Sequence, residues 1–203
     1  MLASVPARGR CGWGETRWLA AGYGGLAGFF VLERLLRQPG EPSNLKASGD
    51  DRGTTQMIIA AYGLAVDVPL LARWLPGRPL PPAAAPAGLV VEATGLAWRA
   101  WSMRTLGRSY SRTLRVVEGD DQQAVVDAGP YRLIRHPGYL GSLLTWVGFA
   151  LTSRRVPVVA LIAGVLGVAY GRRIAAEEQL LRRDLHGYTT YSERTKKLIP
   201  FVW

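Results

Sequence analysis

Residues 137–171 read PGYLGSLLTWVGFALTSRRVPVVALIAGVLGVAYG, two charge-free stretches separated only by Ser153-Arg154-Arg155. So short a connection makes the chain turn back on itself, and the sequence therefore predicts a tight antiparallel helical hairpin over residues 137–173. Pro157 suits the first turn of the returning helix, because the backbone N–H that proline lacks has no partner there. We place this hairpin at the centre of the predicted fold.

Three more charge-poor stretches precede the hairpin, so that helices are predicted at 18–36, 54–75, 83–104, 137–153 and 156–173. These spans extend the charge-free runs. They include arginines, because an arginine side chain can reach the membrane interface from inside a helix, and they tolerate one acidic residue near an end. Each charge-free run falls short of the roughly 20 residues that cross a bilayer core, but five runs together indicate a membrane bundle. The predicted fold class is all-α, an integral membrane bundle of about five transmembrane helices.

The charge of the chain agrees with a membrane protein. Its 203 residues include 25 Lys and Arg against 15 Asp and Glu, a net charge of +10, while 48% are hydrophobic. A soluble nucleic-acid-binding protein is seldom so apolar, and a soluble enzyme is seldom so basic. Most Arg and Lys residues of the connecting segments lie on the side that holds the C-terminus, which predicts a cytoplasmic C-terminus and contact with anionic lipid. No nucleic acid is expected as a partner.

The segment from Gly129 to Gly141 is dense in polar and turn residues at the point where the helix 137–153 begins. Pro137 disfavours helical backbone at His136 and favours it directly afterwards, so His136 is predicted at the N-cap. Free backbone N–H groups beside Arg135 would then suit a carboxylate or a phosphate. The alternative is an interfacial anchor, with arginine and tyrosine side chains at the level of the lipid headgroups.

Arg173 and Glu177 lie four residues apart and therefore on one helical face. They can form an ordinary i,i+4 ion pair of little energetic weight. If the two hairpin helices have matched lengths, however, this pair returns to the level of His136 and Tyr139. The sequence then predicts one cytoplasmic-side pocket that contains a cation, an anion, an imidazole and a phenol.

Four other ionisable residues lie in or near the predicted spans, where such groups by default face the bundle interior: Glu33, Asp67, Glu92 and Arg99. Structural pairing and a substrate role are both open for them. The tail contains Tyr188 and Tyr191, which either line a ligand or seat the tail at the interface. No spacing of histidine or cysteine predicts a metal site.

These residues together resemble the isoprenylcysteine carboxyl methyltransferase family. The resemblance rests on VVDAGPYRLIRHPGYLG at residues 125–141, the hydrophobic hairpin, Arg173 with Glu177-Glu178, and the two tail tyrosines. It covers residues 105–200 and implies a methyltransferase core at 105–203. The three N-terminal helices, within residues 1–104, are then expected on the substrate side.

Members of that family are multi-helix membrane enzymes that take S-adenosylmethionine from the cytoplasmic side and methylate a carboxylate reached through the lipid. The resemblance thus implies carboxyl O-methylation of a lipophilic, isoprenylcysteine-like acid, either a small molecule or a prenylated cysteine. Arg173 is implied as the substrate contact and catalytic candidate, with Arg135 as the fallback. The implied cofactor-binding residues are Gln123, Ala124, Val125, Val126, Tyr131, His136, Pro137, Gly138, Tyr139 and Glu177.

The sequence is also compatible with two other functions. One is a membrane reductase with a nicotinamide cofactor, because such enzymes share the Arg-His-Pro-x-Tyr element of residues 135–139. The other is a non-enzymatic membrane component, such as a scaffold or a channel, in which Arg135 and Glu177 are only interfacial anchors.

Overall fold

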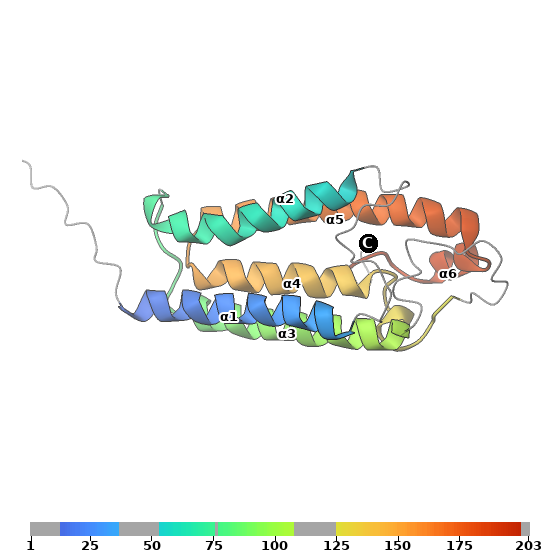
Figure 1. Ribbon diagram of the computed structural model, residues 1–203, viewed down its shortest axis with the longest axis horizontal. Coiled ribbons are helices and arrows are strands. Elements are labelled where there is room, and N and C mark those ends of the chain that lie inside the picture. The colour runs from blue at the N-terminus through green and yellow to red at the C-terminus, as the bar shows by residue number, and fades with distance from the viewer. Residues whose placement is uncertain (1–12, 37–52, 76, 108–124, 200–203) are drawn as a thin grey trace, which may run out of the picture.

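The computed structural model of this chain describes residues 13–36, 53–75, 77–107 and 125–199. Within these ranges the regular elements are helices, and two isolated backbone bridges are the closest approach to a strand. The predicted all-α class is therefore confirmed. Five longer helices run along the molecule, and a short sixth helix lies at one end (Figure 1): α1 Trp13–Leu36, α2 Thr54–Asp67, α3 Ala84–Leu106, α4 Pro137–Thr152, α5 Val156–Asp184 and α6 Tyr188–Arg194.

The predicted span at 54–75 is helical as far as Trp74, but the type of helix changes within it. The α-helix ends at Asp67, and Val68–Trp74 forms a 3-10 helix instead. Pro69 has no backbone N–H to donate, and its ring clashes with the carbonyl of the residue four positions earlier. The apolar pattern continues through this change of helix type, so hydropathy alone does not reveal it. The short α6 was not predicted at all.

Three of the described helices are long and apolar enough to cross a membrane, Thr16–Leu36, Thr54–Ala72 and Val156–Asp184. This composition is that of a membrane protein. By contrast, α4 has 16 residues, about 24 Å at 1.5 Å per residue, and α3 contains the charged Glu92 and Arg99. The number of five crossings and the orientation of the chain therefore stay predictions.

The helices form layers, with α2 against α5 on one side, α4 in the middle, and α1 with α3 on the other side (Figure 1). Glycines set the distance between α3 and α4. A Cβ atom on Gly95 would lie 2.4 Å from the backbone nitrogen of Thr145, and one on Gly148 would lie 2.3 Å from that of Glu92. Only glycine permits this approach, because any side chain at these positions overlaps the opposite backbone.

An aromatic core joins the layers. The ring of Tyr62 on α2 stacks on Trp146 of α4 with a centroid distance of 4.7 Å. The Tyr62 and Tyr170 hydroxyls are hydrogen-bonded at 2.9 Å, which links α2 to α5. Phe29 of α1 meets the same Trp146 edge to face at 6.1 Å. This core packs α1, α2 and α5 against the middle of α4.

Candidate functional site

The candidate site lies at the end of the bundle where α4 begins and where the chain returns after α6 (Figure 1). His136 is the N-cap of α4, and Pro137 is the first residue of the helix, as predicted. The backbone N–H of Arg135 donates to the Lys196 carbonyl at 2.8 Å, and that of His136 donates to the Lys197 carbonyl at 2.9 Å. The tail is thus hydrogen-bonded to the segment that introduces α4.

Glu177 is the centre of the polar contacts. Its Oε1 accepts hydrogen bonds from the Tyr139 hydroxyl and, at 3.1 Å, from Arg173 Nε. Its Oε2 lies 3.6 Å from His136 Nδ1. His136, Arg173 and Glu177 are only 5%, 3% and 4% exposed. The expected proximity of these residues is observed, and the ion pair of Arg173 with Glu177 is buried, so that it does not lie on a solvated face.

Two threonines that the sequence did not single out also bind Arg173. Its Nη1 donates to the hydroxyl of Thr54 at 2.9 Å and to that of Thr55 at 3.0 Å. Both hydroxyls belong to the first turn of α2, directly after Gly53, whose φ of 76° favours glycine. The only signal in the sequence was a pair of hydroxyl residues at the start of an apolar helix.

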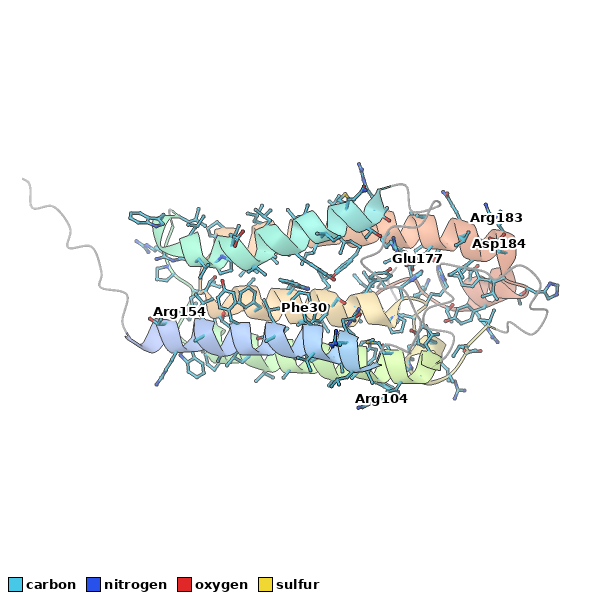
Figure 2. All side chains as sticks on the ribbon, viewed as in Figure 1. Phe30, Arg104, Arg154, Glu177, Arg183 and Asp184 are labelled. Carbon is cyan, nitrogen blue, oxygen red and sulfur yellow. The ribbon has the colours of Figure 1, made fainter. Side chains whose placement is uncertain are left out.

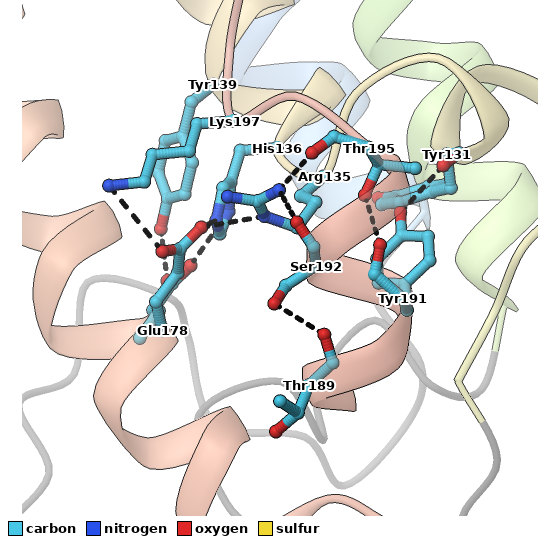
Figure 3. Close-up of polar contacts among 11 residues, drawn as sticks. Tyr131, Arg135, His136, Tyr139, Glu178, Thr189, Tyr191, Ser192, Thr195 and Lys197 are labelled. Atoms are coloured by element: carbon cyan, nitrogen blue, oxygen red, sulfur yellow. Dashed lines mark hydrogen bonds and ion pairs between the residues drawn. The ribbon is translucent and has the colours of Figure 1, made fainter. Parts of the chain in front are cut away.

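Arg135 holds the tail (Figure 3). Its Nε donates to Glu178 Oε1 at 2.8 Å, and its Nη1 donates to the Ser192 carbonyl at 2.8 Å and to the Thr195 carbonyl. Lys197 Nζ lies 3.7 Å from the same carboxylate of Glu178. Arg135, predicted as the second candidate for catalysis, thus has a structural role, because it joins the start of α4 to α5 and to the tail.

Replacing Arg135 by glutamine is expected to loosen the tail. The change removes the charge-assisted bond to the largely buried Glu178, and breaking such a buried pair costs about 3–5 kcal/mol. We expect a lower thermal midpoint. We also expect faster proteolytic cleavage after residue 185, measured by mass spectrometry of the fragments. The matched control is Arg132→Gln, because Arg132 is exposed and lies only three residues away. If the Arg135 variant were cleaved no faster than this control, Arg135 would not be the residue that holds the tail against α5.

The two tail tyrosines have different surroundings. The Tyr191 hydroxyl donates to the Tyr131 carbonyl at 2.7 Å, and therefore seats the tail. The Tyr188 hydroxyl is buried and has no hydrogen-bond partner within the described part of the chain. Burial raises the pKa of Tyr188 above its usual value, so this hydroxyl stays protonated at neutral pH. Of the pair, Tyr188 is the one that suits a ligand.

A second buried polar atom near the site has no hydrogen bond. His136 Nε2 lies 3.4 Å from Glu178 Oε1 but has no hydrogen-bond partner among the described residues. Buried polar atoms are nearly always hydrogen-bonded, since leaving one unpaired costs free energy. These two atoms on His136 and Tyr188, which make no hydrogen bond to the described residues, and the two nearby glutamates fit a ligand that carries both negative and positive groups.

The remaining residues predicted to bind the cofactor differ in their surroundings. Tyr131 is buried in the short 3-10 helix Gly129–Arg132, and Val125 packs against Tyr188 and Tyr191. Val126 is half-buried, while Gln123 and Ala124 lie outside the described residues. The free amide donors expected where α4 begins are fewer than predicted, because the N–H groups of the third and fourth residues of α4 both donate to the His136 carbonyl.

Comparison with known proteins agrees with the resemblance described above. A probable protein-S-isoprenylcysteine O-methyltransferase from Oryza sativa subsp. indica is 32% identical over 57% of this chain and 60% of its own length. Protein-S-isoprenylcysteine O-methyltransferase A from Arabidopsis thaliana is 29% identical over 57% of this chain and 58% of its own length. A nickel-cobalt-cadmium resistance protein from Alcaligenes xylosoxydans xylosoxydans is 27% identical over 49% and 46%, respectively.

The chain thus spans 60% or less of the length of these relatives. Residues 84–186, just over half of the chain, match the family model described as phospholipid methyltransferase. That match begins with α3, upstream of the boundary predicted at residue 105, and contains His136, Tyr139, Arg173 and Glu177. The chain belongs to the phospholipid methyltransferase family.

Proposed function

We propose that this protein is a membrane-embedded methyltransferase that takes a methyl group from S-adenosylmethionine and gives it to the carboxylate of a lipophilic acid. One observation carries the proposal. Within the region that matches the family, His136, Tyr139, Arg173 and Glu177 meet at a buried site, and His136 Nε2 makes no hydrogen bond to the described residues. The isoprenylcysteine methyltransferases among the relatives support an acid acceptor.

The residues of the site fit the polar groups of S-adenosylmethionine. Its carboxylate would accept from His136 Nε2 and the Tyr188 hydroxyl, two buried atoms near the site that have no hydrogen-bond partner within the described ranges. Its ammonium would pair with Glu177. The ring of Tyr139, between His136 and Tyr170, offers an aromatic face to the sulfonium.

S-adenosylmethionine supplies a methyl group on a sulfonium, so that the O–CH3 bond of an ester forms as the S–CH3 bond breaks. No proton moves in this transfer, because a carboxylic acid is already ionised at neutral pH. The protein therefore has to orient the acceptor and keep water out, and needs no strong base. We assign the orientation of the acceptor carboxylate to the positive charge of Arg173, whose guanidinium is held in place by Glu177 and the two threonines.

The double change of Thr54 and Thr55 to valine is expected to lower kcat/KM for the acceptor about tenfold or more. Each hydroxyl accepts a bond from Arg173 Nη1, and a bond to a charged group contributes roughly 1.5–3 kcal/mol. The affinity for S-adenosylmethionine should stay within about twofold of that of the wild type. An unchanged acceptor kcat/KM would show that these hydroxyls do not orient Arg173 for the transfer.

The proposed function is tested by ligand binding to the purified chain in lipid nanodiscs. Isothermal titration with S-adenosylmethionine should give a saturable heat, and titration with NADPH should give none. The converse result would support the reductase alternative. Methyl transfer is then measured with radiolabelled donor and two acceptors, a farnesylated cysteine analogue and a long-chain fatty acid. Absence of any binding of S-adenosylmethionine by folded protein would overturn the proposal.

A further inference from the structure

An ion pair between the buried Arg99 and the half-buried Glu33 connects α1 to α3 close to the candidate site. Arg99 on α3 is 7% exposed, and its Nε donates to Glu33 Oε1 of α1 at 2.6 Å. Its Nη2 pairs with the same oxygen. The guanidinium also lies over the Phe29 ring, 4.9 Å from the ring centre. Charge, hydrogen bonds and an aromatic face therefore hold this guanidinium in one orientation.

The same guanidinium reaches the first turn of α4. Arg99 Nη1 donates to the Gly138 carbonyl at 2.8 Å and to the Ser142 hydroxyl. The Ser142 hydroxyl in turn donates to the Gly138 carbonyl at 3.0 Å. Gly138 stands between Pro137 and Tyr139, the residue whose hydroxyl donates to Glu177. Arg99 thus contacts the backbone of the segment that presents Tyr139 to the site.

The backbones of α3 and α4 also touch at this level. A Cβ atom on Gly141 would lie 2.8 Å from the backbone nitrogen of Arg99. Because this leaves no gap between the helices, the base of the Arg99 side chain is fixed relative to α4. A buried ion pair is by itself weak evidence for stability, since an apolar pair of similar volume is often as stable. Its directional bond to the Gly138 carbonyl, in contrast, is a constraint that apolar side chains cannot supply.

We infer that Glu33 and Arg99 are positioning residues for the donor site. They fix the first turn of α4 so that Tyr139 and His136 stand at the correct distance from Glu177. The inference rests on the proposed function for the identity of the ligand. Glu33 belongs to α1, outside the residues 84–186 that match the family, so the N-terminal helix of this chain takes part in ordering the site.

The test uses the full chain in nanodiscs with Glu33→Leu and Arg99→Met combined. These side chains approximate the volume of the ion pair, so we expect a thermal midpoint close to that of the wild type. We expect the Kd for S-adenosylmethionine to rise about tenfold or more, because the bond to Gly138 is lost. Arg99→Lys is the second variant, in case the double change does not fold. It keeps the charge for Glu33 but cannot hold all three acceptors, and the expected rise in Kd is about threefold to tenfold.

Arg154→Gln is the matched control. Arg154 lies at the opposite end of the bundle from the site (Figure 2) and also bonds a backbone carbonyl, that of Leu80, from Nε at 2.9 Å and from Nη2 at 2.7 Å. Its replacement should leave the Kd unchanged. A loss of affinity equal to that of the Arg99 variants would mean that general loosening of the bundle is responsible, and would overturn the inference.

A second measurement separates this inference from the proposed function. Hydrogen exchange of the amides at 138–142, followed without any ligand, should accelerate in the Glu33→Leu, Arg99→Met protein and not in Arg154→Gln. Wild-type protein that does not bind the donor would contradict the proposed function, and accelerated exchange would still support the positioning role. Unchanged exchange, or a donor Kd within twofold of that of the wild type, would overturn the positioning role alone.

Discussion

Glu177→Gln is expected to weaken the binding of S-adenosylmethionine at least about 100-fold, the largest effect on ligand binding that we anticipate. The carboxylate accepts from Tyr139 and Arg173 and lies 3.6 Å from His136. The amide keeps the size of the side chain but loses the negative charge, leaving Arg173 buried without its counter-ion and the donor ammonium without a partner. Loss of one partner from a buried charge pair costs about 3–5 kcal/mol, which corresponds to roughly two to three and a half orders of magnitude in affinity.

The measurement is isothermal titration of the purified variant in nanodiscs, together with its thermal midpoint. Glu193→Gln is the matched control, because Glu193 lies in the neighbouring α6 and is exposed. It should bind the donor as the wild type does. A folded Glu177→Gln protein with wild-type affinity would remove Glu177 from the donor site and, with it, the arrangement on which the proposed function depends.

Gly148→Ala is expected to destabilise the protein by about 3 kcal/mol or more, although alanine favours helices over glycine by about 1 kcal/mol. The added Cβ would lie 2.3 Å from the backbone nitrogen of Glu92 and 2.6 Å from the Gly88 carbonyl. Neither atom can move without shifting α3. Because α3 carries Arg99 and α4 carries His136, we expect the same change to disturb the site at a distance.

The control for this prediction is Gly164→Ala on α5, where an added Cβ would meet nothing within 4 Å. The same chemical change should there leave stability unchanged or raise it slightly, since only helix propensity acts. Thermal unfolding in detergent, followed by circular dichroism, compares the two variants directly. Equal midpoints for both would show that α3 and α4 do not pack as closely as described.

Much of the fold could be predicted from local signals in the sequence. The spacing of charges located all five longer helices, and Pro137 placed His136 at the N-cap of α4. Steric restriction by proline acts on adjacent residues, so it can be read without knowing the fold. The change from α-helix to 3-10 helix beside Pro69 follows from the same restriction, although the apolar pattern of residues 54–75 continues through it.

The sequence by itself located the five longer helices, indicated a membrane protein, and placed Arg173 and Glu177 on one helical face. Only the tertiary structure decided which side chains surround that face. Thr54 meets Arg173 across 119 positions, and Glu33 meets Arg99 across 66. Helical periodicity is a local property, whereas the contact between two helices depends on the rotation and depth of each, set here by glycines and aromatic rings far apart in the chain. For this reason the proximity of Arg173 and Glu177 to His136 and Tyr139 was predictable, while the threonines and the ion pair that lie beside them were not.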